Sequence, residues 1–298
     1  MGNLNENMRG AILMMAAMAA FALNDAILKA LVVNNAPLQV IFLRGCVTLI
    51  LVYFVLSRIT GPVSFRMSRR DAKWVAIRSV AETCASLGII MALSQMPFAN
   101  VSATLQSTPL LISVGAAIAF GVPLGWRRLL AIAIGFVGVL LIVKPGPEGF
   151  SNGVLWALLG VSSVTVRDLS VKAMSSDVNA STVTFFAILC TTVIFGLSCI
   201  GGDWGVWSPR DLFLLVLVAC AIIAAYALSV IVMKVGDISF VAPYRYTALI
   251  WALLIGFFVF NETPDIWTFL GAGVIAVTGV YTLIGERRMT RQIQTDLR

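Results

Sequence analysis

Asp25-Ala-Ile-Leu-Lys-Ala30 recurs in the second half of the chain as Asp168-Leu-Ser-Val-Lys-Ala173, and the same shift places Gly10 on Gly153. We call this correspondence the repeat alignment. A slightly smaller shift pairs Ala103 with Ala242 and Thr108 with Thr247, more weakly. The chain therefore looks duplicated. We predict a first copy in residues 1–146 and a second copy in residues 147–298.

The composition places nearly the whole chain in a membrane. Of its 298 residues, 59% are hydrophobic and only 12% are charged, whereas soluble domains carry about 25% charged residues. Pro, Gly and Asn turn signals separate apolar runs that suit a hydrocarbon core about 30 Å thick. These runs predict transmembrane helices at 9–32, 38–57, 74–95, 99–121, 127–144, 153–173, 180–200, 211–233, 238–260 and 266–285.

Basic residues between these runs set the orientation. With both termini in the cytoplasm, fourteen of the 21 Lys and Arg residues lie on the cytoplasmic side, against only Lys144 and Arg210 on the other, as the positive-inside rule requires. Each half then has an odd number of spans, so the second half enters the membrane from the opposite side. We expect an all-α integral protein of a bacterial inner membrane, with ten transmembrane helices as two inverted five-helix repeats around a central cavity, an architecture typical of secondary transporters.

The predicted fifth helix of each half carries small residues on one stripe. They recur at i, i+4 and i+7 in both helices: Ala131, Gly135 and Gly138 in the first half, and Ala272, Ala276 and Gly279 in the second. Small residues let helices approach closely in lipid, where association depends on packing. We therefore interpret the stripes as packing surfaces that also support the duplication.

Three groups of residues carry a family resemblance: Phe42-Leu43-Arg44-Gly45; Gly125-Trp126-Arg127-Arg128 leading to Gly135-Phe136-Val137-Gly138-Val139; and Val241-Ala242-Pro243-Tyr244-Arg245-Tyr246 followed by Phe260-Asn261-Glu262. On the basis of these three groups, the chain resembles the EamA-like branch of the drug/metabolite transporter superfamily over nearly its whole length. The resemblance implies ten helices, a central cavity and alternating access, for substrates such as amino acids, vitamins, nucleosides or organic cations.

The chain departs from this family before the predicted fifth helix. The family often has Gly-Glu there, whereas this chain has Val122-Pro123-Leu124-Gly125 and keeps only Glu262 in the second half. We therefore expect the fifth helix of the first half to be anchored differently.

Acidic residues inside the predicted spans are site candidates, because a charge at mid-bilayer costs at least about 2.5 to 3.5 kcal/mol and should face partners or water. Asp25 and Glu82 are the most deeply placed acids. Lys29 lies four residues after Asp25 and Arg78 four before Glu82, so each pair can share a helix face. A structural ion pair is thus the alternative to a role in substrate binding or proton coupling.

Arginine residues inside the spans allow two interpretations. Arg44 and Arg245 lie too deep to reach the surface easily, and each can clamp a carboxylate through its planar guanidinium. The alternative is that they pair with Asp25, Glu82 or Asp168. Arg167 and Asp168 lie nearer the cytoplasmic end, where a structural or gating role is expected.

Proline residues interrupt the fourth helix of each half at Pro109 and Pro243, and interrupted helices in corresponding positions are the best sequence pointer to a transport site. The predicted substrate-binding residues are Asn24, Asp25, Arg44, Glu82, Gln106, Trp156, Tyr226, Tyr244, Arg245 and Trp251. The predicted coupling or gating residues are Glu82, Asp25, Arg167 and Asp168. For any single aromatic residue, helix packing or a position at the membrane interface is the alternative.

Missing motifs restrict the function. The chain has no P-loop for ATP and no histidine. An aspartyl pair of Asp25 and Asp168 is conceivable, but an inverted repeat directs the two toward opposite faces. The basic residues form no stripe for nucleic acid, and the five cysteines lack metal-ligand spacing. We expect no enzyme activity, cofactor, metal or nucleic-acid partner.

The sequence therefore predicts a secondary active transporter of a small polar or aromatic metabolite, such as an amino acid or related compound, by alternating access. Proton coupling and exchange are both open, as is a homodimer. A riboflavin-like importer is the alternative within the family, and a channel or receptor is the alternative from another class.

Overall fold

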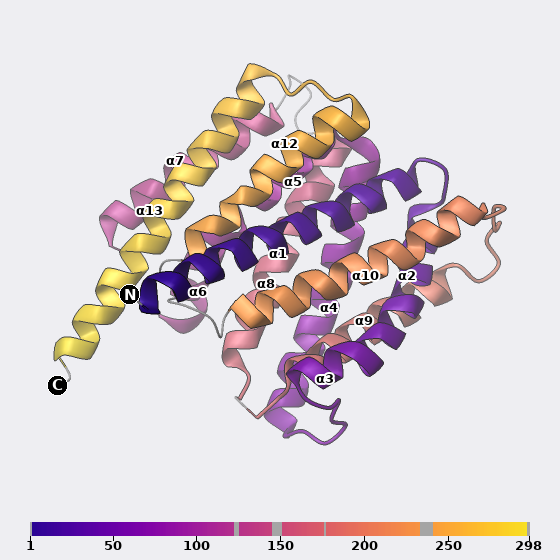
Figure 1. The fold of residues 1–298 in the computed structure, drawn as a ribbon, viewed down its shortest axis with the longest axis horizontal. Coiled ribbons are helices and arrows are strands. Elements are labelled where there is room, and N and C mark those ends of the chain that lie inside the picture. The colour runs from indigo at the N-terminus through magenta and orange to yellow at the C-terminus, as the bar shows by residue number, and fades with distance from the viewer. Residues whose placement is uncertain (1, 122–124, 145–150, 176, 233–240, 297–298) are drawn as a thin grey trace.

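The computed structural model of the protein describes residues 2–121, 125–144, 151–175, 177–232 and 241–296. Regular structure within these ranges is helical, and the helices pack side by side in one bundle (Figure 1). Both chain ends lie on the same side of this bundle, which we call the terminal end. The opposite side, where residues 33–36 connect the first two helices, is the far end.

The described residues of the first half form five helical segments. They are α1 (Gly2–Val32); α2 (Pro37–Leu51), continued by a π-helical turn (Val52–Leu56) and α3 (Ser57–Thr60); α4 (Arg69–Gln95); α5 (Phe98–Leu105) with α6 (Thr108–Phe120); and α7 (Trp126–Val143). The second half contributes α8 (Asn152–Ala173), α9 (Ala180–Ser198), α10 (Pro209–Val232), the 3₁₀ turn η2 (Ala242–Tyr246) with α12 (Thr247–Phe260), and α13 (Ile266–Asp296).

The predicted spans coincide with these helices, with differences at their ends. Charged and polar residues extend α1, α4 and α13 beyond the apolar runs, because a helix continues past the membrane wherever no breaker stops it. Ser68 caps α4 by accepting a hydrogen bond from the Asp71 amide at 3.0 Å. Residues 238–240 of the predicted ninth span lie outside the described residues.

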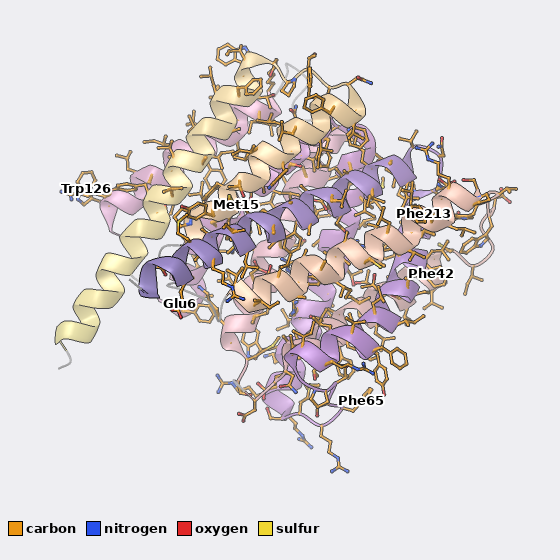
Figure 2. The ribbon with its side chains drawn as sticks, viewed as in Figure 1. Glu6, Met15, Phe42, Phe65, Trp126 and Phe213 are labelled. Carbon is orange, nitrogen blue, oxygen red and sulfur yellow. The ribbon has the colours of Figure 1, made fainter. Side chains whose placement is uncertain are left out.

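Eight of the described helical segments are long and apolar enough to cross a membrane. The remaining two apolar helices are shorter, Leu129–Val143 and Ile266–Thr282. They are the predicted fifth helices of the two halves. The chain is thus an integral membrane protein with all-helical spans, and its exterior carries large exposed hydrophobic side chains such as Trp126 and Phe213 (Figure 2).

Glycine residues bring selected helices into close contact. α7 packs against α13, and Gly138 of the first predicted stripe approaches the α13 backbone, since its Cβ would lie 2.9 Å from the Gly271 carbonyl oxygen. Gly279 of the second stripe instead approaches Tyr246. α4 packs against α8 in the same manner, since a Cβ on Gly88 would lie 2.6 Å from the Gly160 nitrogen. These contacts replace side-chain interdigitation by direct backbone approach, as is common in membranes.

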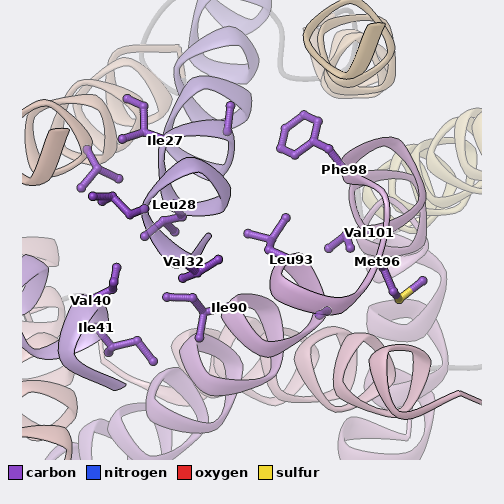
Figure 3. Close-up of a cluster of buried hydrophobic side chains, with 14 of the residues drawn as sticks. Ile27, Leu28, Val32, Val40, Ile41, Ile90, Leu93, Met96, Phe98 and Val101 are labelled. Carbon is purple, nitrogen blue, oxygen red and sulfur yellow. The ribbon is translucent and has the colours of Figure 1, made fainter. Parts of the chain in front are cut away.

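The largest hydrophobic core among the described residues, drawn in Figure 3, includes residues on both sides of the far-end connection at 33–36. It gathers buried side chains from α1, α2, α4 and α5, including Val32, Val40, Leu93 and Phe98. Side chains of α8, α9, α10 and α12 complete it. The core therefore joins helices of both halves and fills the bundle at this end.

Candidate functional site

A cavity of about 210 Å³ lies in the bundle on the terminal-end side of this core. Its floor includes Leu28, Ile41 and Ile90, which belong to the core itself. Its polar lining comes from most of these helical segments: Asn24, Asp25, Arg44, Glu82, Ser86, Ser102, Gln106, Thr108, Arg167, Asp168, Tyr226 and Arg245. Seven of the ten predicted substrate-binding residues, and all four predicted coupling or gating residues, thus face one space.

Repeat-related positions meet in this cavity. The repeat alignment relates Phe21, Asn24 and Asp25 of α1 to Val164, Arg167 and Asp168 of α8, and all six line the wall. Asp25 and Asp168 therefore share one cavity, although the sequence directs them toward opposite faces. Each has its own neighbour, since Asn24 bonds to Asp25 and Arg167 bonds to Asp168.

The interruptions of the fourth helices also meet. α5 ends at Leu105 and α6 begins at Thr108, while the 3₁₀ turn η2 precedes α12, so both predicted breaks are confirmed. Gln106 Nε2 donates to the Arg245 carbonyl at 3.2 Å, and these two positions correspond under the shift that pairs Thr108 with Thr247. A carbonyl released by one broken helix is thus satisfied by a side chain at the break of the other.

Glu82 is the centre of a charged cluster between α4 and α8. Its Oε2 lies 3.8 Å from Arg78 Nη1, one helical turn earlier, and 3.4 Å from Arg167 Nη1. Arg167 Nε also bonds to Asp168 Oδ1 at 2.9 Å. The predicted Arg78–Glu82 pair is confirmed, and the cluster links both halves of the chain.

Arg44 and Arg245 have different surroundings. Arg44 Nη2 donates to Asn24 Oδ1 at 3.2 Å, and no carboxylate among the described residues lies within 4.0 Å of its guanidinium. The Arg245 side chain is exposed and likewise lacks an ion pair within the described part of the chain. The expected pairing of either arginine with Asp25, Glu82 or Asp168 is therefore not found there, and both residues line the cavity.

Three predicted binding residues lie elsewhere. Trp156 packs against the far-end core, where its carbonyl approaches Gly88. Trp251 donates from Nε1 to the Met15 carbonyl at 3.2 Å, between α12 and α1. Tyr244 lines a separate crevice of about 500 Å³ between α12 and α13. Aromatic residues suit helix packing as well as binding, so residue type alone could not separate these roles.

Three polar residues of the cavity wall were missed by the sequence analysis: Ser86, Ser102 and Thr108. Ser86 lies four residues after Glu82 on α4, and Ser102 lies four residues before Gln106 on α5. Residues four apart occupy the same helix face. Extending each predicted polar position by one turn would therefore have found both serines.

Lys29 lies near the far end, outside the cavity. Its ammonium group pairs with Glu262 Oε1 at 2.6 Å and donates to the Met96 carbonyl at 2.8 Å. Glu262 in turn accepts from the Phe98 amide at 2.9 Å and the Ala99 amide at 3.4 Å, at the start of α5. The expected pairing of Lys29 with Asp25 is therefore wrong, because an acid from the other half of the chain lies closer.

Comparison with known proteins identifies the family. The model of the EamA-like transporter family matches residues 8–144 and, a second time, residues 151–285. The chain belongs to this family. The description of this family and the names of its relatives refer to transporters, and neither refers to an enzyme.

Relatives of this EamA-like protein are named for different metabolites. The S-adenosylmethionine uptake transporter of Rickettsia conorii is 27% identical over 165 residues, which cover 55% of each chain. The riboflavin transporter of Vibrio cholerae is 27% identical over 64% of each chain. The pseudopaline exporter CntI of Pseudomonas aeruginosa is 22% identical over 90% of this chain and 93% of the exporter. The match thus spans about half the length of the first of these relatives.

A solved crystal structure shares the fold. It superposes with a TM-score of 0.63 at 17% identity, over 94% of this chain and 98% of the other. At this identity the likeness concerns the fold alone.

Proposed function

We propose that the protein is a secondary active transporter that moves a small polar metabolite by alternating access, with residues 1–146 and 147–298 as two inverted five-helix halves. The observation that carries this proposal is that repeat-related side chains of α1 and α8 line one cavity. Inverted-repeat transporters hold their substrates at the interface between the repeats. The twofold match of the family model supports the same division.

The two ends of the bundle support alternating access. A carrier must close one end of its cavity while the other is accessible. Here the hydrophobic core and the Lys29–Glu262 ion pair lie between the cavity and the far end. With both termini in the cytoplasm of a bacterial cell, as the basic residues favour, the far end faces away from the cytoplasm across the inner membrane.

The cavity favours an amino acid or a related zwitterion as substrate. Its volume of about 210 Å³ is below the range of about 300 to 1,000 Å³ typical of pockets for drug-sized ligands. Its wall offers carboxylates and two guanidinium groups without carboxylate partners among the described residues. Such a guanidinium binds a substrate carboxylate through two parallel hydrogen bonds.

A flat ring such as riboflavin is the second candidate. Phe21 and Tyr226 both line the cavity and contact each other edge to face, with ring centroids 5.9 Å apart. Aromatic walls of this kind bind planar rings, and one relative is named for riboflavin. The smaller volume and the charged wall favour the zwitterion.

Coupling would reside in the charged residues of the wall. Glu82 of α4 is linked to the second half through Arg167 of α8, so its protonation would weaken a link that crosses the repeat interface. Asp25, Arg167 and Asp168 are proposed to act with it. If the Glu82→Gln variant retains proton-driven uptake, Glu82 is excluded from proton coupling.

Counterflow in liposomes tests the function. Purified protein is reconstituted with an unlabelled compound inside, and uptake of the labelled compound is followed with all ion gradients collapsed, for an amino-acid panel, S-adenosylmethionine and riboflavin. A carrier accumulates one compound saturably and loses this activity in Arg44→Gln. Rapid ion flux without counterflow would favour a channel instead.

A further inference from the structure

The two repeat-related aspartates have different preceding residues. The repeat alignment matches Asn24, before Asp25, with Arg167, before Asp168. In the second half the Arg167 guanidinium bonds directly to Asp168 at 2.9 Å. In the first half the Asn24 amide donates to Asp25 Oδ1 at 2.8 Å. Asp168 thus has a cation beside it, whereas Asp25 has a neutral amide.

Asn24 also separates Asp25 from Arg44. Its Nδ2 bonds to the Asp25 carboxylate, and its Oδ1 accepts from Arg44 Nη2 at 3.2 Å. Asn24 is buried, with only 3% of its surface exposed, and these two hydrogen bonds hold its side chain in place. Among the described residues no ion pair joins Asp25 to Arg44, and both groups line the cavity.

We propose that Asn24 is a specificity-determining residue. As a neutral spacer it keeps Asp25 and Arg44 from binding each other, which leaves Asp25 to bind the cationic group and Arg44 to bind the carboxylate of a zwitterionic substrate. This inference rests on the proposed function and deepens it by naming the substrate class. The repeat-related position in the second half differs, because Arg167 already binds Asp168 and Glu82.

Charged thiol reagents test this charge separation without any substrate. Phe21 and Val164 are repeat-related, both line the cavity, and each lies four residues before its aspartate. Phe21→Cys and Val164→Cys are made singly in the full chain after its five cysteines are replaced by serine. Each is reacted with methanethiosulfonates carrying a trimethylammonium or a sulfonate group. The cation-to-anion rate ratio is expected to be about tenfold higher at position 21, because Asp25 lacks the directly bonded cation that Asp168 has, and a unit charge a few ångströms away changes the local potential by this order.

Three variants identify the groups responsible. Asp25→Asn, which keeps the side-chain shape, is expected to lower the ratio at position 21 to the value at position 164. Asn24→Arg reproduces the second half and is expected to do the same. Arg167→Gln is expected to raise the ratio at position 164. If Asn24→Arg fails to fold, Asp25→Asn and Arg167→Gln still decide the question.

Equal ratios at the two reporter positions, or a ratio at position 21 that ignores Asp25→Asn, would overturn the proposal. The reagent chemistry requires no transport, so its outcome is separate from that of counterflow. Unequal ratios in a protein without counterflow would refute the carrier but not the charge separation. Counterflow of a neutral compound with equal ratios would refute the role of Asn24 but not the carrier.

Discussion

The Lys29–Glu262 pair is expected to hold the far end closed. It connects the end of α1 to the residue two positions after α12, and through Met96, Phe98 and Ala99 it reaches the junction of α4 and α5. Opening the far end must separate these segments. The perturbations are Lys29→Met, which keeps most of the side-chain stem, and Glu262→Gln, which keeps an acceptor for the α5 amides.

The magnitude follows from the geometry of the pair. The two side chains are only 14% and 17% exposed and meet at 2.6 Å, so the pair is a short, charge-assisted hydrogen bond shielded from most solvent. A hydrogen bond to a charged group contributes about 1.5 to 3 kcal/mol. Since each step of about 1.4 kcal/mol is tenfold in an equilibrium constant, either variant is expected to raise the ratio of open to closed far end about ten- to a hundredfold.

Spin labels measure this ratio directly. Val33, just after α1, and Ile266, at the start of α13, are both exposed at the far end. Cysteines at these two positions carry the labels in a background without the five native cysteines. Pulsed electron paramagnetic resonance should show one short distance in the otherwise unchanged protein and an added longer distance in each variant. The double variant should add little to either single one, because both remove the same interaction.

Lys172→Met is the matched control. Lys172 is the repeat partner of Lys29, is exposed, and has no acidic side chain within ion-pair distance among the described residues. This variant should leave the far-end distances unchanged. The reasoning is refuted if Lys29→Met and Glu262→Gln leave the distribution unaltered, or if Lys172→Met alters it equally.

Three further outcomes follow from the contacts. Gly88→Ala should destabilise the protein by about 1 to 3 kcal/mol through overpacking, because its Cβ would lie 2.7 Å from the Trp156 carbonyl oxygen. Gly273→Ala is the control, since its Cβ would meet nothing within 4 Å, and equal melting temperatures of the two variants would contradict the reasoning. Arg167→Gln should lower the melting temperature more than Arg245→Gln, since of these two only Arg167 has ion pairs among the described residues, and the reverse order would count against the Glu82 cluster. Arg44→Lys keeps the charge but loses the planar fork, so counterflow should show a higher KM at nearly unchanged maximal rate, and an unchanged KM would exclude Arg44 from carboxylate binding.

Local sequence signals were sufficient for the helices and for most of the cavity. Hydrophobic runs between turn residues predict the crossing segments because every backbone polar group in lipid must be satisfied within a helix. The duplicated Asp-x-x-x-Lys segments and the paired prolines mark polar positions of the site, and Asn24, Asp25, Gln106, Arg167 and Asp168 all line the cavity. All five are polar or charged residues within apolar segments, where burial in lipid disfavours them unless they face partners or water. The inverted repeat alone directed Asp25 and Asp168 toward opposite faces, so it did not predict that they share this cavity.

Long-range partners could not be derived in this way. Spacing of four residues suggested Asp25 for Lys29, but Glu262 is nearer because α1, α5 and the end of α12 converge at the far end. Trp156 is a second example, since its ring fits both a binding site and the core that it actually joins. Pairing of this kind depends on how helices are arranged in space, which periodicity along one helix does not contain.

The same contacts explain why two similar halves need not behave alike. A duplicated, inverted chain with identical sequences would close both ends by the same interaction. Here Lys29 and Lys172 are both retained, whereas Glu262 is present in the second half and residues 122–125 of the first contain no acid. The far end is therefore held by an ion pair that the segment before α7 does not supply for Lys172. Under the proposed inverted symmetry the two ends of the bundle are alternatives, and a carboxylate that is present only in the second half is expected to give closure of the two ends different free energies.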